Sequence, residues 1–275
     1  MIDRITNIFL LFLLILGFVA VAEAEVQQRI LWAVVAGGVF GALSFFLNWL
    51  TLDGSTSAWL LGVITFGIAG IEGAAILIFF FISSSLLSKN SRSLDDVREL
   101  KFRRTCAQVW ANGFWFGFFI LLGLLVDLEL FKVAAYSSIA FATSDTWASE
   151  IGGNRIKGTT WSINGFQKVP PGTDGAISFA GTFAAVGGSL SIGVLVGMLL
   201  PTNSLVMGIL VASTGLVATF MDSWLGAHFQ GQYLVNSTNR FFSSQFLYVG
   251  NNTVNWLSAG LASLLTILIY LIIQQ

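Results

Sequence analysis

Residues 106–126 read CAQVWANGFWFGFFILLGLLV and contain no charged side chain. About 20 apolar residues are needed for an α-helix to cross the hydrocarbon core of a bilayer, so this stretch predicts a transmembrane helix. Other apolar runs flank it, at residues 5–22, 30–50, 58–87, from 130 towards 145, and at 176–200, 204–221 and 254–273. The sequence therefore predicts an all-α polytopic integral membrane helix bundle with about eight transmembrane helices.

The composition agrees with this fold class. Of the 275 residues, 55% are hydrophobic and only 10% are charged, and the mean hydropathy is +0.81. These values are typical of a polytopic membrane protein and allow one membrane domain, residues 1–275, without a separate soluble domain. The single cysteine, Cys106, excludes an intrachain disulfide, and the single histidine, His228, argues against a His-based zinc site. The net charge of −1 does not point to nucleic acid.

Two of the apolar runs have more than one interpretation. Ala22-Glu23-Ala24 resembles a signal-peptide cleavage site, but the only basic residue before the run is Arg4 and another span follows at once. We therefore expect residues 1–22 to be retained. The run at 58–87 exceeds the length that a bilayer requires, so its helix is tilted, broken or extends beyond the membrane. It carries Glu72 near its middle, which either faces a polar interior or is protonated or hydrogen-bonded between helices.

The charged residues gather in three polar segments, at residues 88–104, 144–175 and 222–253. The first segment is basic, and basic loops remain on the cytoplasmic side of a membrane. If each apolar run crosses once, residues 23–29 and all three polar segments share the cytoplasmic or stromal side. The short turns then face the other side, at residues 51–57, 127–130 and 201–203. This arrangement predicts that the N-terminus lies outside.

Three carboxylates lie at the predicted cytoplasmic ends of spans: Asp145, Glu150 and Asp222. Mg²⁺ is bound by one or two carboxylates together with phosphate oxygens, so these side chains suit a magnesium site. Asp145 and Glu150 are five residues apart and would act together only if the helix ends or breaks near Gly152. Asp222 alone is also compatible with a helix-end or interface role.

Residues 168–178, KVPPGTDGAIS, lead directly into the sixth span. A glycine-flanked turn at a helix N-terminus, with Thr173, Ser178 and a nearby Lys168, is suited to hold phosphate. The same letters are also typical of an ordinary turn. Asn112, Asn252 and Asn255 have an alternative role as interhelical hydrogen-bonding groups, and the arginines at 98–104 as a positive-inside anchor.

Several long motifs resemble the membrane family that includes phytyl-phosphate kinase and transmembrane protein 19, also described as domain of unknown function 92. The likeness spans most of the chain and rests on Ala111-Asn112-Gly113, on residues 144–152 (SDTWASEIG), on residues 169–178 (VPPGTDGAIS), on residues 222–227 (DSWLGA) and on residues 252–255 (NTVN). A weaker likeness to dolichol kinases and phosphatidate cytidylyltransferases points to CTP.

The resemblance implies a membrane-embedded kinase that transfers a phosphoryl group from a nucleoside triphosphate, CTP or another, to a phytyl or geranylgeranyl monophosphate. It implies Mg²⁺ on Asp145, Glu150 and Asp222, with Lys168 as a further catalytic residue. The implied substrate and phosphate contacts are Asn112, Thr173, Asp174, Ser178, Lys101, Arg104, Asn252 and Asn255. The attacking phosphate oxygen is already ionised, so catalysis needs positioning and charge neutralisation more than a general base.

Two other functions remain open from the sequence. A CTP-dependent lipid cytidylyltransferase would use similar residues and release pyrophosphate. A transporter would use Glu72 as the coupling carboxylate and should show internal repeats with broken helices.

Overall fold

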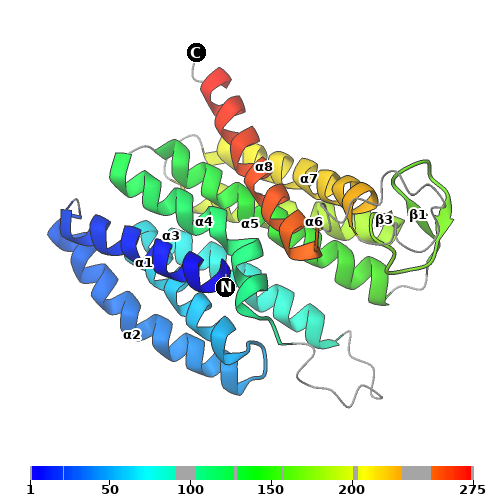
Figure 1. Ribbon diagram of the computed structural model, residues 1–275. Helices are drawn as coiled ribbons and strands as arrows, with labels where there is room; N and C mark the ends of the chain where they lie inside the picture. Colours follow the sequence, from blue (N-terminus) through cyan, green and yellow to red (C-terminus); the bar gives the residue numbers. More distant parts are fainter. Residues whose placement is uncertain are drawn as a thin grey trace, which may run out of the picture.

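The computed structural model describes residues 2–20, 22–90, 103–126, 129–155, 158–200, 204–230 and 249–273. These residues form eight α-helices, one π-helical turn and three short strands. The elements are α1 (Ile2–Ala20), α2 (Ala24–Phe46), α3 (Leu52–Asn90), α4 (Cys106–Val126), α5 (Glu129–Ser149), the π-helix Glu150–Arg155, β1 (Thr160–Ser162), β2 (Lys168–Val169), β3 (Ala176–Ile177), α6 (Phe179–Leu199), α7 (Ser204–Phe229) and α8 (Asn251–Ile273). Figure 1 shows α1 and α2 at one edge of the bundle and the small sheet at one end.

Helix α5 forms the centre of the bundle. It packs against α3, α4, α6, α7 and α8, and every residue from Val133 to Ser144 is buried. Small side chains permit this close packing: a Cβ atom added to Gly215 of α7 would lie 2.6 Å from the Cβ atom of Ala140. Small residues at helix contacts are typical of membrane bundles, because they let two backbones approach.

The outer surface of the bundle is apolar. Large hydrophobic side chains such as Val19, Phe46 and Leu268 are more than half exposed, which is the pattern of a protein surrounded by lipid tails. Among the described residues, six helices are long and apolar enough to cross a membrane: α2, α3, α4, α6, α7 and α8. The predicted class, a helical integral membrane bundle, is confirmed.

Helix α3 is broken at Gly70 and folds back on itself. Gly70 has φ 65° and ψ −149°, a backbone conformation open essentially only to glycine. A Cβ atom added to Gly73 would lie 3.0 Å from Cγ2 of Thr65, although eight residues of straight helix would separate these positions by about 12 Å. Both halves of α3 reach the same neighbour, because Gly54 touches the backbone of Arg104 and Phe80 lies under its guanidinium. The long run at 58–87 is therefore a helical hairpin.

This hairpin corrects the predicted alternation of sides. Thr51 donates its backbone N–H to Arg104, so the turn at 51–57 lies at the same end of the bundle as the segment after α3. Arg29, near the start of α2, lies beside Gly70 at the opposite end. Asn7 of α1 accepts a hydrogen bond from Trp110 near the start of α4, at 2.6 Å, and the N-terminal end of α1 therefore shares the end that holds the polar segments. The sequence had placed residues 23–29 with these segments and the N-terminus and residues 51–57 opposite them, because it counted α3 as one crossing.

The hairpin also changes the position of Glu72. The sequence placed this carboxylate near the middle of a single span, but it follows the reversal at Gly70 by two residues and is half-buried at the end of the bundle far from Arg104.

Two further differences concern the polar segments. Helix α7 continues to Phe229, eight residues beyond its predicted end. Residues 160–177 form a small antiparallel sheet of order β2-β1-β3, with Trp161 paired to Lys168 and to Ile177. The sequence had predicted only a polar loop there.

Candidate functional site

A cavity of about 330 Å³ opens at the end of the bundle beside the small sheet. Its walls come from the last turns of α5 and α7, the π-helix, the β2–β3 turn, the N-terminus of α6 and the start of α8. The polar residues that line it are Asp145, Ser149, Thr160, Thr173, Asp174, Ser178, Thr182, Thr219, Asp222, Ser223, Gln230 and Asn251. Asp145, Asp222 and the 172–178 turn, which are far apart in the sequence, thus share one cavity.

Asp145 and Asp222 both line this cavity. They are close enough for the charge of Asp145 to act on Asp222, and Asp222 is only 8% exposed. Asn255 of α8 lies against the pair, because its Nδ2 donates to Oδ2 of Asp145 at 3.4 Å. Within the part of the chain that is described, Oδ1 of Asp222 and Oδ1 of Asn255 are buried without a hydrogen-bond partner. A buried oxygen without a partner is costly, so these atoms point to a ligand.

The residues around this pair fit a hard cation. Mg²⁺ prefers oxygen ligands and is held by one or two carboxylates plus substrate phosphates, and the unpartnered oxygens of Asp222 and Asn255 beside Asp145 supply such a donor set. No group of three or more His, Cys, Asp or Glu side chains within the described ranges is arranged to hold a metal ion. The fit is therefore to an ion that takes its remaining ligands from substrate and water.

Glu150 is separated from the two aspartates. It begins the π-helix, accepts a hydrogen bond from Ser88 of α3 at 2.7 Å, and its charge acts on Arg104. It is not among the residues that line the cavity. The helix break expected near Gly152 is present as the π-helix, but Glu150 still faces Ser88 of α3. The sequence had grouped this carboxylate with Asp145 and Asp222 as a third metal ligand.

The turn at 172–178 is fixed by close backbone contacts. Gly175 has φ +71°, and a Cβ atom there would lie 2.6 Å from the carbonyl oxygen of Ser223. Ser178 is the N-cap of α6: its Oγ accepts the backbone N–H of Gly181 at 3.1 Å and donates to the carbonyl of Gly152 at 3.4 Å. Gly181 and Thr182, in the first turn of α6, line the cavity. A helix N-terminus that opens into a cavity favours an anion there.

The side chains of Thr173 and Asp174 complete this wall of the cavity. Thr173 lines the cavity and donates its Oγ1 to the carbonyl of Pro170 at 2.7 Å. Asp174 also lines it, and burial raises the pKa of its carboxyl above the ordinary 3.8. An ionised carboxylate repels a phosphate, whereas backbone N–H groups at a helix N-terminus attract one, so Thr173 and the α6 N–H groups are better phosphate contacts than Asp174.

Lys168 and Asn252 lie outside the cavity. Lys168 is exposed on β2, at the edge of the sheet away from β3, and Asn252 is exposed at the start of α8. Its neighbour Asn251 lines the cavity instead. Arg104 and Asn112 line a second cavity, between the halves of α3, and Asn112 accepts a hydrogen bond from Asn255 at 3.3 Å. Lys101 lies outside the described residues.

Sequence reasoning missed the stripe on α7 that faces the cavity. Thr219, Asp222, Ser223, Gly226 and Gln230 all line it, and their spacing of three, four, seven and eleven residues is that of one helix face. The signal was present in the sequence, but ending the span at residue 221 hid it.

Comparison with known families agrees with the motifs. A family model described as integral membrane protein DUF92 matches residues 34–263, a range that contains the cavity. The chain belongs to this family. The predicted multi-pass membrane character is therefore confirmed, and so is the family resemblance.

Relatives of known sequence are found in a plant, an archaeon and a cyanobacterium. The chain is 29% identical over 238 residues to protein VTE6, chloroplastic, of Arabidopsis thaliana, covering 82% of this chain and 67% of that protein. It is 30% identical to an uncharacterized membrane protein of Methanocaldococcus jannaschii, covering 67% of this chain and 76% of that protein. It is also 30% identical to an uncharacterized membrane protein of Synechocystis, covering 71% of this chain and 80% of that protein. No solved structure matches.

Proposed function

We propose that this protein is an isoprenoid monophosphate kinase embedded in the membrane. It would transfer the terminal phosphoryl group of a nucleoside triphosphate to a phytyl- or geranylgeranyl-type monophosphate, giving the prenyl diphosphate and a nucleoside diphosphate. The observation that carries the proposal is the pairing of Asp145 and Asp222, with unpartnered buried oxygens, at a cavity walled by the N-terminus of α6. The motif resemblance to the family of phytyl-phosphate kinase supports the same reaction.

The proposed reaction is an in-line displacement at phosphorus. An oxygen of the prenyl phosphate attacks the terminal phosphorus, the bond from that phosphorus to the bridging oxygen breaks, and the electron pair leaves with the nucleoside diphosphate. The attacking oxygen is already ionised near neutral pH, so no side chain has to remove a proton. Lys168 is not needed in this scheme, because it lies outside the cavity.

The side chains of this protein would then position charge. Asp145, Asp222 and the side-chain oxygen of Asn255 are the groups that would hold Mg²⁺, which when bound neutralises phosphate charge. The backbone N–H groups in the first turn of α6 would bind phosphate oxygens. Asn255 orients Asp145 through their hydrogen bond, and Ser178 holds the start of α6 in place by capping it.

The test is a substrate panel with purified protein in detergent or nanodiscs. Phytyl and geranylgeranyl monophosphate are each incubated with CTP, ATP, GTP or UTP and Mg²⁺, and the nucleotide and lipid products are separated by chromatography. The proposal expects a nucleoside diphosphate and a prenyl diphosphate in equal amounts, lost in Asp145→Asn and retained in Asn252→Ala, whose side chain is exposed and outside the cavity.

Three results would overturn the proposal. If no combination of lipid monophosphate and nucleotide is turned over, and Asp145→Asn behaves like the wild type, the kinase activity is refuted. Release of pyrophosphate would assign a cytidylyltransferase. Uptake of a solute by proteoliposomes that is abolished in Glu72→Gln would assign a transporter.

A further inference from the structure

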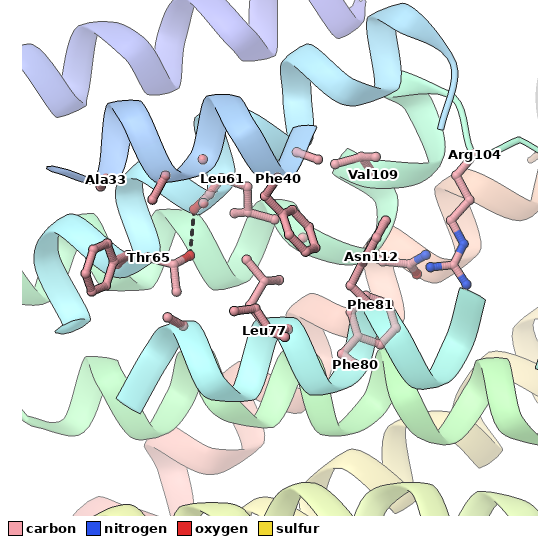
Figure 2. A pocket seen from close by; sticks show the side chains of 18 of the residues that line it. Ala33, Phe40, Leu61, Thr65, Leu77, Phe80, Phe81, Arg104, Val109 and Asn112 are labelled. Carbon is pink, nitrogen blue, oxygen red and sulfur yellow. Dashed lines mark hydrogen bonds between the residues drawn. The ribbon is translucent and has the colours of Figure 1, made fainter. Parts of the chain in front are cut away.

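A second cavity, of about 360 Å³, lies between the two halves of α3 and the neighbouring helices α2 and α4 (Figure 2). Its walls are aromatic and aliphatic, with Phe40, Leu61, Leu77 and Phe81 among them. Thr65 is the one polar side chain labelled along its length in Figure 2, and its hydroxyl donates to the carbonyl of Leu61 at 2.6 Å. The length of this cavity therefore suits an apolar chain.

One end of this cavity is polar. Arg104 and Asn112 line the cavity, and Figure 2 shows the guanidinium of Arg104 and the amide of Asn112 at the same end of it. The guanidinium lies 5.7 Å above the ring of Phe80. Burial lowers the pKa of Arg104 to about 10, although the charge of Glu150 opposes the shift, so this side chain is a cation at neutral pH.

One amide joins this polar end to the first cavity, which holds Asp145 and Asp222 and is called the carboxylate cavity below. Nδ2 of Asn255 donates to Oδ1 of Asn112 at 3.3 Å and to Oδ2 of Asp145 at 3.4 Å. A group bound between Arg104 and Asn112 is thus one side chain away from the site proposed for the terminal phosphate.

The other parts of the cavity wall reach the outer surface of the bundle. Ile71 and Ile78 line the cavity and are 74% and 42% exposed. An apolar chain in this cavity therefore has a side open to the surrounding lipid.

We infer that the cavity inside the α3 hairpin is the binding site for the isoprenoid tail of the monophosphate, with Arg104 and Asn112 receiving its phosphate. The inference rests on the proposed function for the identity of the ligand. An apolar cavity with a cation and an amide at one end matches an amphiphile with an anionic head. The hydrogen bonds of Asn255 to Asn112 and Asp145 place that head next to Asp145. Arg104 acts as a substrate-binding residue, distinct from the loop anchor that the sequence also allowed.

The direct test is photo-crosslinking, which needs no turnover. A geranylgeranyl monophosphate with a diazirine on the terminal isoprene unit is irradiated with wild-type protein in nanodiscs, and the modified peptides are identified by mass spectrometry. The expected label is on the inner faces of the α3 halves, at residues such as Leu61, Thr65 and Leu77, and unlabelled geranylgeranyl monophosphate should compete it away. Competition by phosphatidylcholine to the same extent would show a bulk-lipid chain in the cavity and overturn the inference.

A cavity-filling variant gives a second reading. Gly62 lines the cavity and a Cβ atom added to it meets nothing within 4 Å, so Gly62→Leu is expected to place its side chain in the space proposed for the tail. We expect the KM for geranylgeranyl monophosphate to rise about tenfold or more, because each methylene excluded from an apolar site costs nearly fourfold in affinity. Gly62→Ala should show a smaller rise.

Gly187→Leu is the matched control, because Gly187 is also a helical glycine, its added Cβ meets only Trp147 at 3.8 Å, and it lines neither cavity. This variant should leave the KM unchanged. Turnover with crosslinks outside α3, or equal KM values in Gly62→Leu and wild type, would refute the tail site and leave the kinase standing. Crosslinks inside the hairpin without turnover would refute the kinase and leave a prenyl phosphate site.

Discussion

A cysteine at residue 52 is expected to react with a membrane-impermeant maleimide from the same side of the membrane as a cysteine at residue 167. Leu52 is 73% exposed at the start of α3, and Gln167 is exposed between β1 and β2. Cysteines at residues 25 and 129, where Glu25 and Glu129 are both exposed, should react from the other side.

The separation follows from the helix lengths. Helix α2 has 23 residues, which corresponds to about 34 Å of helix, so Glu25 and Leu52 are separated by more than the roughly 30 Å of a hydrocarbon core. The first half of α3 then returns from Leu52 to Gly70, and the second half runs back to the end that holds Ser88 and Glu150. Residue 52 therefore shares a side with the sheet, although a single crossing by α3 would put it opposite.

The assay uses two separate preparations of sealed vesicles, one right-side-out and one inside-out. The background variant is Cys106→Ser, since Cys106 is buried and its sulfur lies 2.9 Å from the hydroxyl of Ser57, a contact that serine can also make. Leu52→Cys and Gln167→Cys are each labelled before and after detergent is added, so that a failure to label is distinguished from burial. Labelling of the two positions from opposite sides would refute the hairpin, because it requires α3 to cross once.

Three further predictions concern the carboxylate cavity. Asp222→Asn should reduce diphosphate formation by about a hundredfold or more, on the scale of other losses of transition-state charge stabilisation, and should raise the Mg²⁺ concentration that gives half-maximal activity. Glu150→Gln should retain most activity. Equal losses of activity in the two variants would return Glu150 to the metal site. Ser178→Ala should destabilise the folded state by about 1 kcal/mol through loss of a helix cap, seen as a lower Tm in detergent, whereas Ser178→Asp should keep the cap. Gly175→Ala should lower the Tm more than Gly172→Ala, because both glycines have positive φ but only Gly175 has backbone against its added Cβ; the reverse order would contradict the packing.

The fold class was predictable because the bilayer imposes one length and one polarity on every crossing. Apolar runs such as residues 106–126 reproduce helix α4 to the residue. The hairpin in α3 was not fixed by the same rule, because both of its halves are apolar and only Glu72 marks the reversal, so that a broken helix was one of three interpretations. The reversal depends on one backbone conformation at Gly70, and a glycine in a membrane helix is far more often a packing residue than a turn.

The carboxylate cavity was predictable in part, for a related reason. Asp145 and Asp222 were found because carboxylates are rare in this chain and both stand near helix ends. Glu150 has the same chemistry at a similar position, but five residues of helix place it on another face than Asp145. The break begins only at Glu150, too late to bring its carboxylate to the pair, and this carboxylate accepts from Ser88 instead. Lys168 was misplaced because sequence proximity to Ser178 was taken for spatial proximity, whereas β1 inserts between β2 and β3.

The position of Asn255 explains why an amide suits the junction of the two cavities. Its Nδ2 donates to both Asp145 and Asn112, while its Oδ1 is left without a partner among the described residues. A carboxylate at this position would repel Asp145 and the phosphate, and a lysine would neutralise the aspartate that the proposed Mg²⁺ requires. An amide carries no charge, donates towards the carboxylate and still offers an oxygen to a cation. On the proposed function, Asn255 therefore holds Asp145 at a fixed position relative to Asn112, which receives the lipid phosphate. Helix α3 holds the tail away from the carboxylate cavity.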